Sequence, residues 1–168
     1  LKRLDALGLP FWLAGGYGTP ERVREALQAG AAGVQVGTAF AFCAESGLRP
    51  DYRHALMRQA VDARAQVFTD PLASPTGFPF KVASLPGTLA EPEVFAERPR
   101  LCDLGYLRTP YLRDGGAVGY RCPAEPIDVF VRKGGSAESA ARAQCLCNAL
   151  LANIGLGQRR GGGVEPGL

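Results

Sequence analysis

Two short apolar segments that end in glycine, separated by one helix-length stretch, constrain the fold of this 168-residue chain most strongly. The first is residues 10–14, which end at Gly15-Gly16, and the second is residues 33–37. Short continuous apolar runs are typical of strands buried on both faces of a parallel sheet. We therefore expect two parallel strands joined by a right-handed crossover, which makes the fold class α/β.

Helix signals lie between and after these strands. Thr19 is a good N-cap, Pro20 suits the first helical position, and Gly30 closes the apolar stripe. Thr38 opens a second helical stretch that reaches Ala44, and residues 51–64 also have helical spacing. Residues 1–7 have helical spacing that begins in mid-element, so we expect the chain to be a fragment.

The remainder of the chain has a different character. Proline recurs from residue 66 to residue 126 and predicts a long, mostly irregular excursion. Residues 127–132 fit a strand or a helix, and Ser136 caps a last helix that runs to about Ile154. The expected organisation is strand–helix units at 1–65, an irregular and partly helical extension at 66–158, and a flexible tail at 159–168.

The glycines at the two strand ends predict a phosphate site. Glycine lets the backbone approach a phosphate because no Cβ intervenes, and the helix that follows Gly37-Thr38 adds unpaired N–H groups. In (β/α)₈ barrels a phosphate commonly binds at the loops after strands seven and eight. The alternative is that Gly15-Gly16 makes a tight turn and Gly37 relieves packing. The residues expected at this site are Ala14, Gly15, Gly16, Gln35, Val36, Gly37 and Thr38.

The same segments resemble a known enzyme family. Residues 14–16 and 29–40 are similar to the FMN-phosphate end of nitronate monooxygenases, formerly called 2-nitropropane dioxygenases. Residues 78–82, 102–106 and 145–155 resemble the C-terminal region of proteins assigned to that family, so the resemblance covers most of residues 8–158. The phosphate motif by itself is less specific, because flavin-dependent enoyl-ACP reductases have a similar one.

The resemblance implies the C-terminal portion of a (β/α)₈ barrel, with FMN as cofactor. It also implies oxidation of a nitronate with dioxygen to a carbonyl compound and nitrite. Members of the family place the catalytic His on earlier strands, so we expect no catalytic residue in this chain and no activity from it alone. A reductase that uses a nicotinamide cofactor is the alternative enzyme. Whether the protein forms a homo-oligomer is left open.

Other polar residues fit simpler roles. His54 lies on a helix expected outside the barrel, so we interpret it as a surface residue rather than a general base. Lys81 and Thr76 lie in the proline-rich excursion and either contribute to the pocket or are solvated. Ser74, Thr76 and Gly77 suit a local turn.

Composition excludes several classes of protein. Five cysteines are an odd number, which is unlike a secreted disulfide framework, and we expect reduced thiols in the cytoplasm. The paired C-x₂₋₄-C spacings of metal sites are absent, so no metal is expected. Turn-rich segments could bring Cys102 and Cys122 close, so the alternatives are a zinc or iron–sulfur site on Cys102, Cys122, Cys145 and Cys147, or a non-catalytic module built on this C-terminal segment. The net charge of +3 is dispersed, which argues against nucleic acid, and no apolar run approaches a bilayer-spanning length of roughly 20 residues.

Overall fold

The computed structural model describes residues 6–168. The chain divides into two compact units, Leu1–Gly47 and Leu48–Leu168. The helical spacing noted at residues 1–7 falls mainly on residues outside the described range.

The division lies after Gly47, whereas the sequence predicted a boundary after residue 65. Helix α4 (Pro50–Val61) belongs to the second unit because its hydrogen bonds lead there. Gln59 donates to the carbonyl of Ser84 at 3.1 Å, and the Tyr52 hydroxyl accepts from the Gly167 N–H at 3.2 Å.

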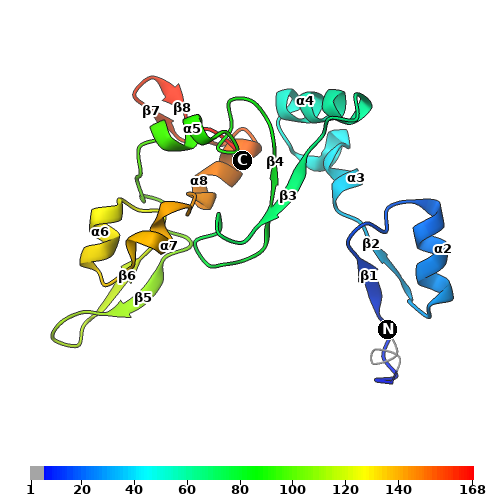
Figure 1. Cartoon of the computed structure of the whole chain (residues 1–168), viewed down its shortest axis with the longest axis horizontal. Helices are drawn as coiled ribbons and strands as arrows, with labels where there is room; N and C mark the ends of the chain where they lie inside the picture. The colour runs from blue at the N-terminus through cyan, green and yellow to red at the C-terminus, as the bar shows by residue number, and fades with distance from the viewer. Residues whose placement is uncertain (1–5) are drawn as a thin grey trace. The chain divides into compact units, whose positions relative to one another are not determined.

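The first unit is the predicted strand–helix–strand unit (Figure 1). It contains β1 (Trp12–Ala14), α2 (Pro20–Gln28), β2 (Gly33–Gln35) and the short α3 (Thr38–Ala41). Strands β1 and β2 are parallel, and the Thr19 side chain caps α2 by accepting from the Arg22 N–H at 3.4 Å. The predicted parallel pair and its crossover helix are confirmed.

The strands of this unit are not covered as the apolar pattern predicted. Only Ala26 and Ala31 are buried hydrophobics among its described residues, and Trp12 in β1 is 59% exposed. The reason is that α2 is the main element packed against the pair and covers one side of it. The apolar strands therefore present faces that nothing in the described unit covers.

The second unit contains two antiparallel hairpins where the sequence predicted irregular chain. Strands β3 (Val67–Asp70) and β4 (Phe80–Ala83) form one hairpin, and β5 (Thr109–Leu112) and β6 (Val118–Arg121) form the other. Each hairpin is a sheet of two edge strands, which tolerate proline better than central strands do. The short helix α5 (Pro92–Glu97) lies between them in sequence.

The helical end of the chain contains three helices. These are α6 (Ile127–Arg132), α7 (Ala137–Ala141) and α8 (Leu146–Asn153), and Ser136 caps α7 as predicted. The single last helix expected from Ser136 to Ile154 is broken, because the Arg100 guanidinium donates a hydrogen bond to the Ala140 carbonyl at 2.7 Å. The Gln144 N–H, which would bond that carbonyl in a continuous helix, donates instead to Ala73 at 2.9 Å.

The glycine-rich end is folded rather than frayed: residues 161–164 are exposed, but Glu165, Gly167 and Leu168 are buried. Strands β7 (Arg159–Arg160) and β8 (Gly163–Val164) form a small hairpin. Leu168 is buried with Leu89, Leu146 and Ala149, and its N–H donates to Asn153 Oδ1 at 2.9 Å. Composition suggested a flexible tail, but these tertiary contacts hold it.

The fold class is mixed α/β. Residues 6–168 contain one parallel strand pair and no closed barrel. None of the helices in this range is long and apolar enough to span a bilayer.

Candidate functional site

The ends of β1 and β2 meet at one edge of the parallel pair. Ala14 is paired with Gln35, so Gly15 and Val36 leave the sheet at the same end. The structure therefore brings together the two segments that the sequence singled out, residues 14–16 and 35–38. That these residues bind a phosphate stays a prediction.

The glycines at this edge have different conformational requirements. Gly15 and Gly16 have φ of +83° and +84°, in the left-handed region that favours glycine. Gly37 has φ of −105°, and a Cβ built on it meets no heavy atom within 4 Å. Neither the backbone nor the packing of the described chain therefore requires glycine at position 37.

Helix α3 begins directly beside this space. Gly37 is its N-cap, Thr38 is its first residue, and the Gly37 carbonyl accepts from the Phe40 N–H at 3.0 Å. The helix was predicted to reach Ala44, but α3 ends at Ala41. The N–H groups of Thr38 and Ala39 precede the first internal hydrogen bonds of the helix, so this edge offers two backbone donors.

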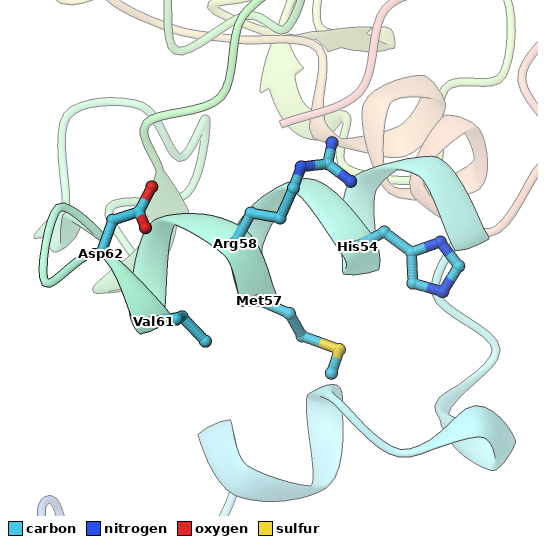
Figure 2. A pocket seen from close by; sticks show the side chains of 5 residues that line it. All are labelled: His54, Met57, Arg58, Val61 and Asp62. Atoms are coloured by element: carbon cyan, nitrogen blue, oxygen red, sulfur yellow. The ribbon is translucent and has the colours of Figure 1, made fainter.

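His54 lies at the surface, as predicted. It is exposed on α4 and lines an open hollow of about 560 Å³ (Figure 2). The other lining residues, Met57, Arg58, Val61 and Asp62, come from the same helix and its C-cap. A single helix face thus supplies these lining residues.

The predicted turn around Ser74 is also confirmed. The hydroxyls of Ser74 and Thr76 are 3.1 Å apart, and the Gly77 N–H donates to the Ser74 carbonyl at 3.1 Å. Lys81 is exposed and donates to Thr69 Oγ1 at 2.6 Å across the β3–β4 hairpin. Local hydrogen bonds thus account for these side chains without a ligand.

The segment that contains the strand edge is similar to known proteins. Residues 2–72 match the family model described as nitronate monooxygenase. A nitronate monooxygenase from Pseudomonas aeruginosa is 36% identical over 88 residues, which is 51% of this chain and 25% of that protein. The resemblance to nitronate monooxygenases is confirmed.

The likeness to nitronate monooxygenases has clear bounds. The chain spans about a quarter of the length of the curated relative, at 25%. The family model covers β1 to β3 and stops at residue 72, so it does not cover the later motifs. No solved structure matches the chain.

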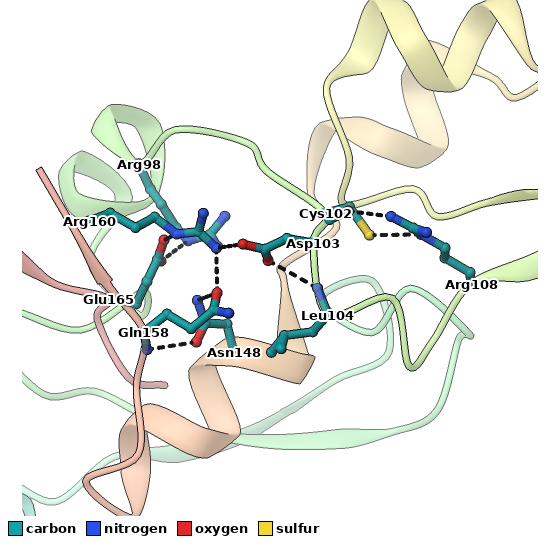
Figure 3. A network of polar contacts seen from close by, with 9 residues as sticks. All are labelled: Arg98, Cys102, Asp103, Leu104, Arg108, Asn148, Gln158, Arg160 and Glu165. Carbon is teal, nitrogen blue, oxygen red and sulfur yellow. Dashed lines mark hydrogen bonds and ion pairs between the residues drawn. The ribbon is translucent and has the colours of Figure 1, made fainter.

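Beyond the nitronate monooxygenase match, a buried charge network joins α5 to the C-terminal hairpin (Figure 3). Glu165 accepts from Arg98 Nε at 2.8 Å, and both side chains are almost fully buried. Arg160 Nε lies 2.7 Å from Glu165 in an ion pair outside hydrogen-bond alignment, and Arg160 also binds Asp103. Because each carboxylate faces an arginine, the network is explained by internal pairing.

This network adjoins the four thiols that the sequence grouped as an alternative metal site or non-catalytic module. Cys122 and Cys145 are buried together with Ala124 and Ala143, and Cys102 and Cys147 pack against them. The four cysteines are free thiols. In the part of the chain that the structure describes, no group of three or more potential ligands is arranged to hold a metal ion. The sequence left open whether these residues meet, and the fold brings them into one cluster.

Proposed function

We propose that this chain forms the FMN-phosphate end of a flavin-dependent oxidoreductase that converts alkyl nitronates and dioxygen to carbonyl compounds and nitrite. The match of residues 2–72 to nitronate monooxygenases supports the reaction class. The observation that carries the proposal is the shared edge of β1 and β2, where the glycine-bearing segments emerge side by side.

The open space at Gly37 fits a phosphate group. Gly37 has an unstrained φ and no neighbour where its Cβ would lie, so the chain alone does not explain the missing side chain. A phosphate seated against this backbone would explain it, because glycine permits closer approach than any other residue. The helix start at Thr38 adds backbone donors and the positive end of peptide dipoles on the same side.

The residues at this edge would have different roles in binding the cofactor. Gly15 and Gly16 keep the β1 loop in its left-handed conformation, and Gly37 leaves room for the phosphate. Thr38 would donate its hydroxyl to a phosphate oxygen, and Ala14, Gln35 and Val36 would place the two backbones. When bound, FMN supplies the electron acceptor of the reaction. We place the group that handles the substrate proton on strands outside this chain.

The uncovered faces of β1 and β2 support a larger barrel. Trp12 and Phe40 are 59% and 65% exposed, although aromatic side chains of this size are usually well buried. Neighbouring strands and helices of a (β/α)₈ barrel would cover such faces. We accordingly propose that the chain alone is inactive. Separately, we propose that the complete protein is cytoplasmic.

The proposal is tested on the complete protein that contains this chain. We expect the purified protein to be yellow, to release FMN on denaturation, and to consume oxygen with ethyl nitronate. Gly37→Val should lose FMN while folding normally. Gly163→Val is the matched control, because Gly163 also lacks a positive φ and close packing.

Two results would contradict the proposal. A colourless protein that cannot be loaded with FMN would exclude the cofactor site, and full FMN retention by Gly37→Val would exclude its position. A third result would keep the flavin but change the reaction. Oxidation of NAD(P)H that depends on an enoyl thioester, without a response to nitronates, would select the enoyl-ACP reductase alternative.

A further inference from the structure

Two thiols in the second unit belong to one packed cluster although they are far apart in sequence. Cys102 lies in the loop that follows α5, and Cys122 follows directly after β6. Cys102 packs against the buried cluster that contains Cys122. The fold therefore places the two thiols in one packed group, which a disulfide between them requires.

Arg100 fixes the backbone around this pair. Its guanidinium donates to the carbonyl of Pro123 at 2.8 Å and to that of Ala140 at 2.7 Å. Pro123 is the residue after Cys122, and Arg100 is two residues before Cys102. One partly buried side chain thus ties both cysteine-bearing segments together, so the fold fixes the packing of Cys102 against the Cys122 cluster.

The two thiols have unequal surroundings. Cys102 is partly exposed, and Arg108 Nε donates to its sulfur at 3.4 Å (Figure 3). Arg108 also donates to the Cys102 carbonyl, which holds the guanidinium beside the sulfur. Cys122 is only 3% exposed. A solvent oxidant therefore reaches Cys102 first, while Cys122 lies behind it.

The electrostatics support the same order of reaction. The hydrogen bond from Cys122 and then the Arg108 guanidinium lower the pKa of Cys102 well below that of an ordinary thiol. The hydrogen bond to Cys102 and burial raise the pKa of Cys122. The thiolate is the nucleophilic form of cysteine, so Cys102 is the attacking sulfur and Cys122 retains its proton.

We propose that Cys102 and Cys122 are a redox-active dithiol that a peroxide oxidises reversibly to an intramolecular disulfide. The Cys102 thiolate attacks one oxygen of hydrogen peroxide and becomes a sulfenic acid, and the other oxygen leaves as hydroxide. The Cys122 thiol then attacks the Cys102 sulfur, the S–S bond forms, and the sulfenic oxygen leaves as water. The dithiol loses two electrons and the peroxide gains them. A reducing thiol reverses the change.

The other two cysteines have a different part in the cluster. Burial raises the pKa of Cys145, so it is a poor nucleophile, and it caps α8 within the core. Cys147 packs against the cluster from the same helix. Oxidation is therefore expected to be selective for the 102–122 pair, and this selectivity makes the proposal testable independently of the flavin site.

The experiment treats the full chain with hydrogen peroxide, blocks remaining thiols with N-ethylmaleimide, and maps the peptides by mass spectrometry without reduction. We expect a Cys102–Cys122 disulfide that dithiothreitol removes. Cys122→Ser should instead leave a Cys102 sulfenic acid that dimedone traps. Arg108→Met should slow Cys102 oxidation at pH 7 about tenfold, because less thiolate is present. Cys43→Ser, which changes a cysteine of the first unit, should leave the result unchanged.

Several outcomes would overturn the proposal. Cys102 that stays reduced in peroxide, or a disulfide that joins Cys102 to Cys145 or Cys147, would exclude the dithiol assignment. Stoichiometric zinc in the purified chain, released when the thiols are blocked, would make the cluster a metal site instead. Far-ultraviolet circular dichroism of each variant separates loss of folding from loss of reactivity, and the unmodified chain supplies a result even if a variant unfolds.

Discussion

Replacement of Arg100 by methionine tests how the second unit is held together. Arg100→Met keeps the length of the apolar stem and removes every donor. In the folded chain the guanidinium bonds the carbonyls of Pro123, Ala140 and Glu125, at 2.8, 2.7 and 3.2 Å. These carbonyls belong to two segments that pack together in the thiol cluster, so the variant should loosen this region.

The magnitude follows from the two short hydrogen bonds. A hydrogen bond to a charged group contributes about 1.5–3 kcal/mol, so the pair contributes about 3–6 kcal/mol. Part of this loss is offset, because methionine removes the cost of burying a cation, and burial lowers the pKa of Arg100. We expect Arg100→Met to reduce the free energy of unfolding by about 3 kcal/mol.

Urea unfolding of the full chain, followed by circular dichroism, measures this difference. With an m-value of about 2 kcal/mol/M, the urea midpoint should fall by about 1.5 M. Arg132→Met is the matched control, because Arg132 pairs with Asp128 on an exposed helix face and should contribute less than about 0.5 kcal/mol. A loss below about 1 kcal/mol for Arg100→Met would refute the reasoning.

Three further results follow from the second unit. Glu165→Gln should lower the unfolding free energy by about 3 kcal/mol, because the buried Arg98 side chain and the partly buried Arg160 side chain lose their carboxylate; calorimetry measures this. Gly167→Ala should cost about 1–3 kcal/mol, since its Cβ would lie 2.2 Å from Asn153 Oδ1; an unchanged melting temperature would contradict this. The alkylation rate of Cys102 should rise with a midpoint near its pKa of about 6, because Cys122 and Arg108 stabilise the thiolate against the opposing Glu125. An alkylation midpoint near the pKa of an ordinary thiol, about 8.5, would contradict the prediction for Cys102.

The first unit could be predicted well because its signals are local. Thr19 and Pro20 set the start of α2, and the apolar runs set β1 and β2. The parallel pairing then followed from the intervening helix, and it placed both glycine segments at one edge. The extent of burial could not be predicted, since it depends on elements that do not belong to this unit.

The second unit was harder to predict because its signals are tertiary. The β5–β6 hairpin had a local sign in Asp114-Gly115-Gly116, which suits a tight turn, but the surrounding prolines obscured it. The break between α7 and α8 arises from Arg100, which is 40 residues before Ala140. The thiol cluster likewise depends on contacts between distant segments, so the sequence left it open.

The central claim is that the edge formed by residues 14–16 and 35–38 binds the phosphate of FMN. The most direct measurement compares FMN with riboflavin, which lacks the phosphate, for binding to the complete apoprotein and to its Gly37→Val variant by flavin fluorescence quenching. The account predicts that the unaltered protein binds FMN at least about a hundredfold more tightly, as two charge-assisted hydrogen bonds of about 1.5 kcal/mol each would provide. It also predicts that Gly37→Val removes most of this preference while riboflavin affinity changes little. Equal affinities in the unaltered protein, or an unchanged preference in Gly37→Val, would contradict the claim.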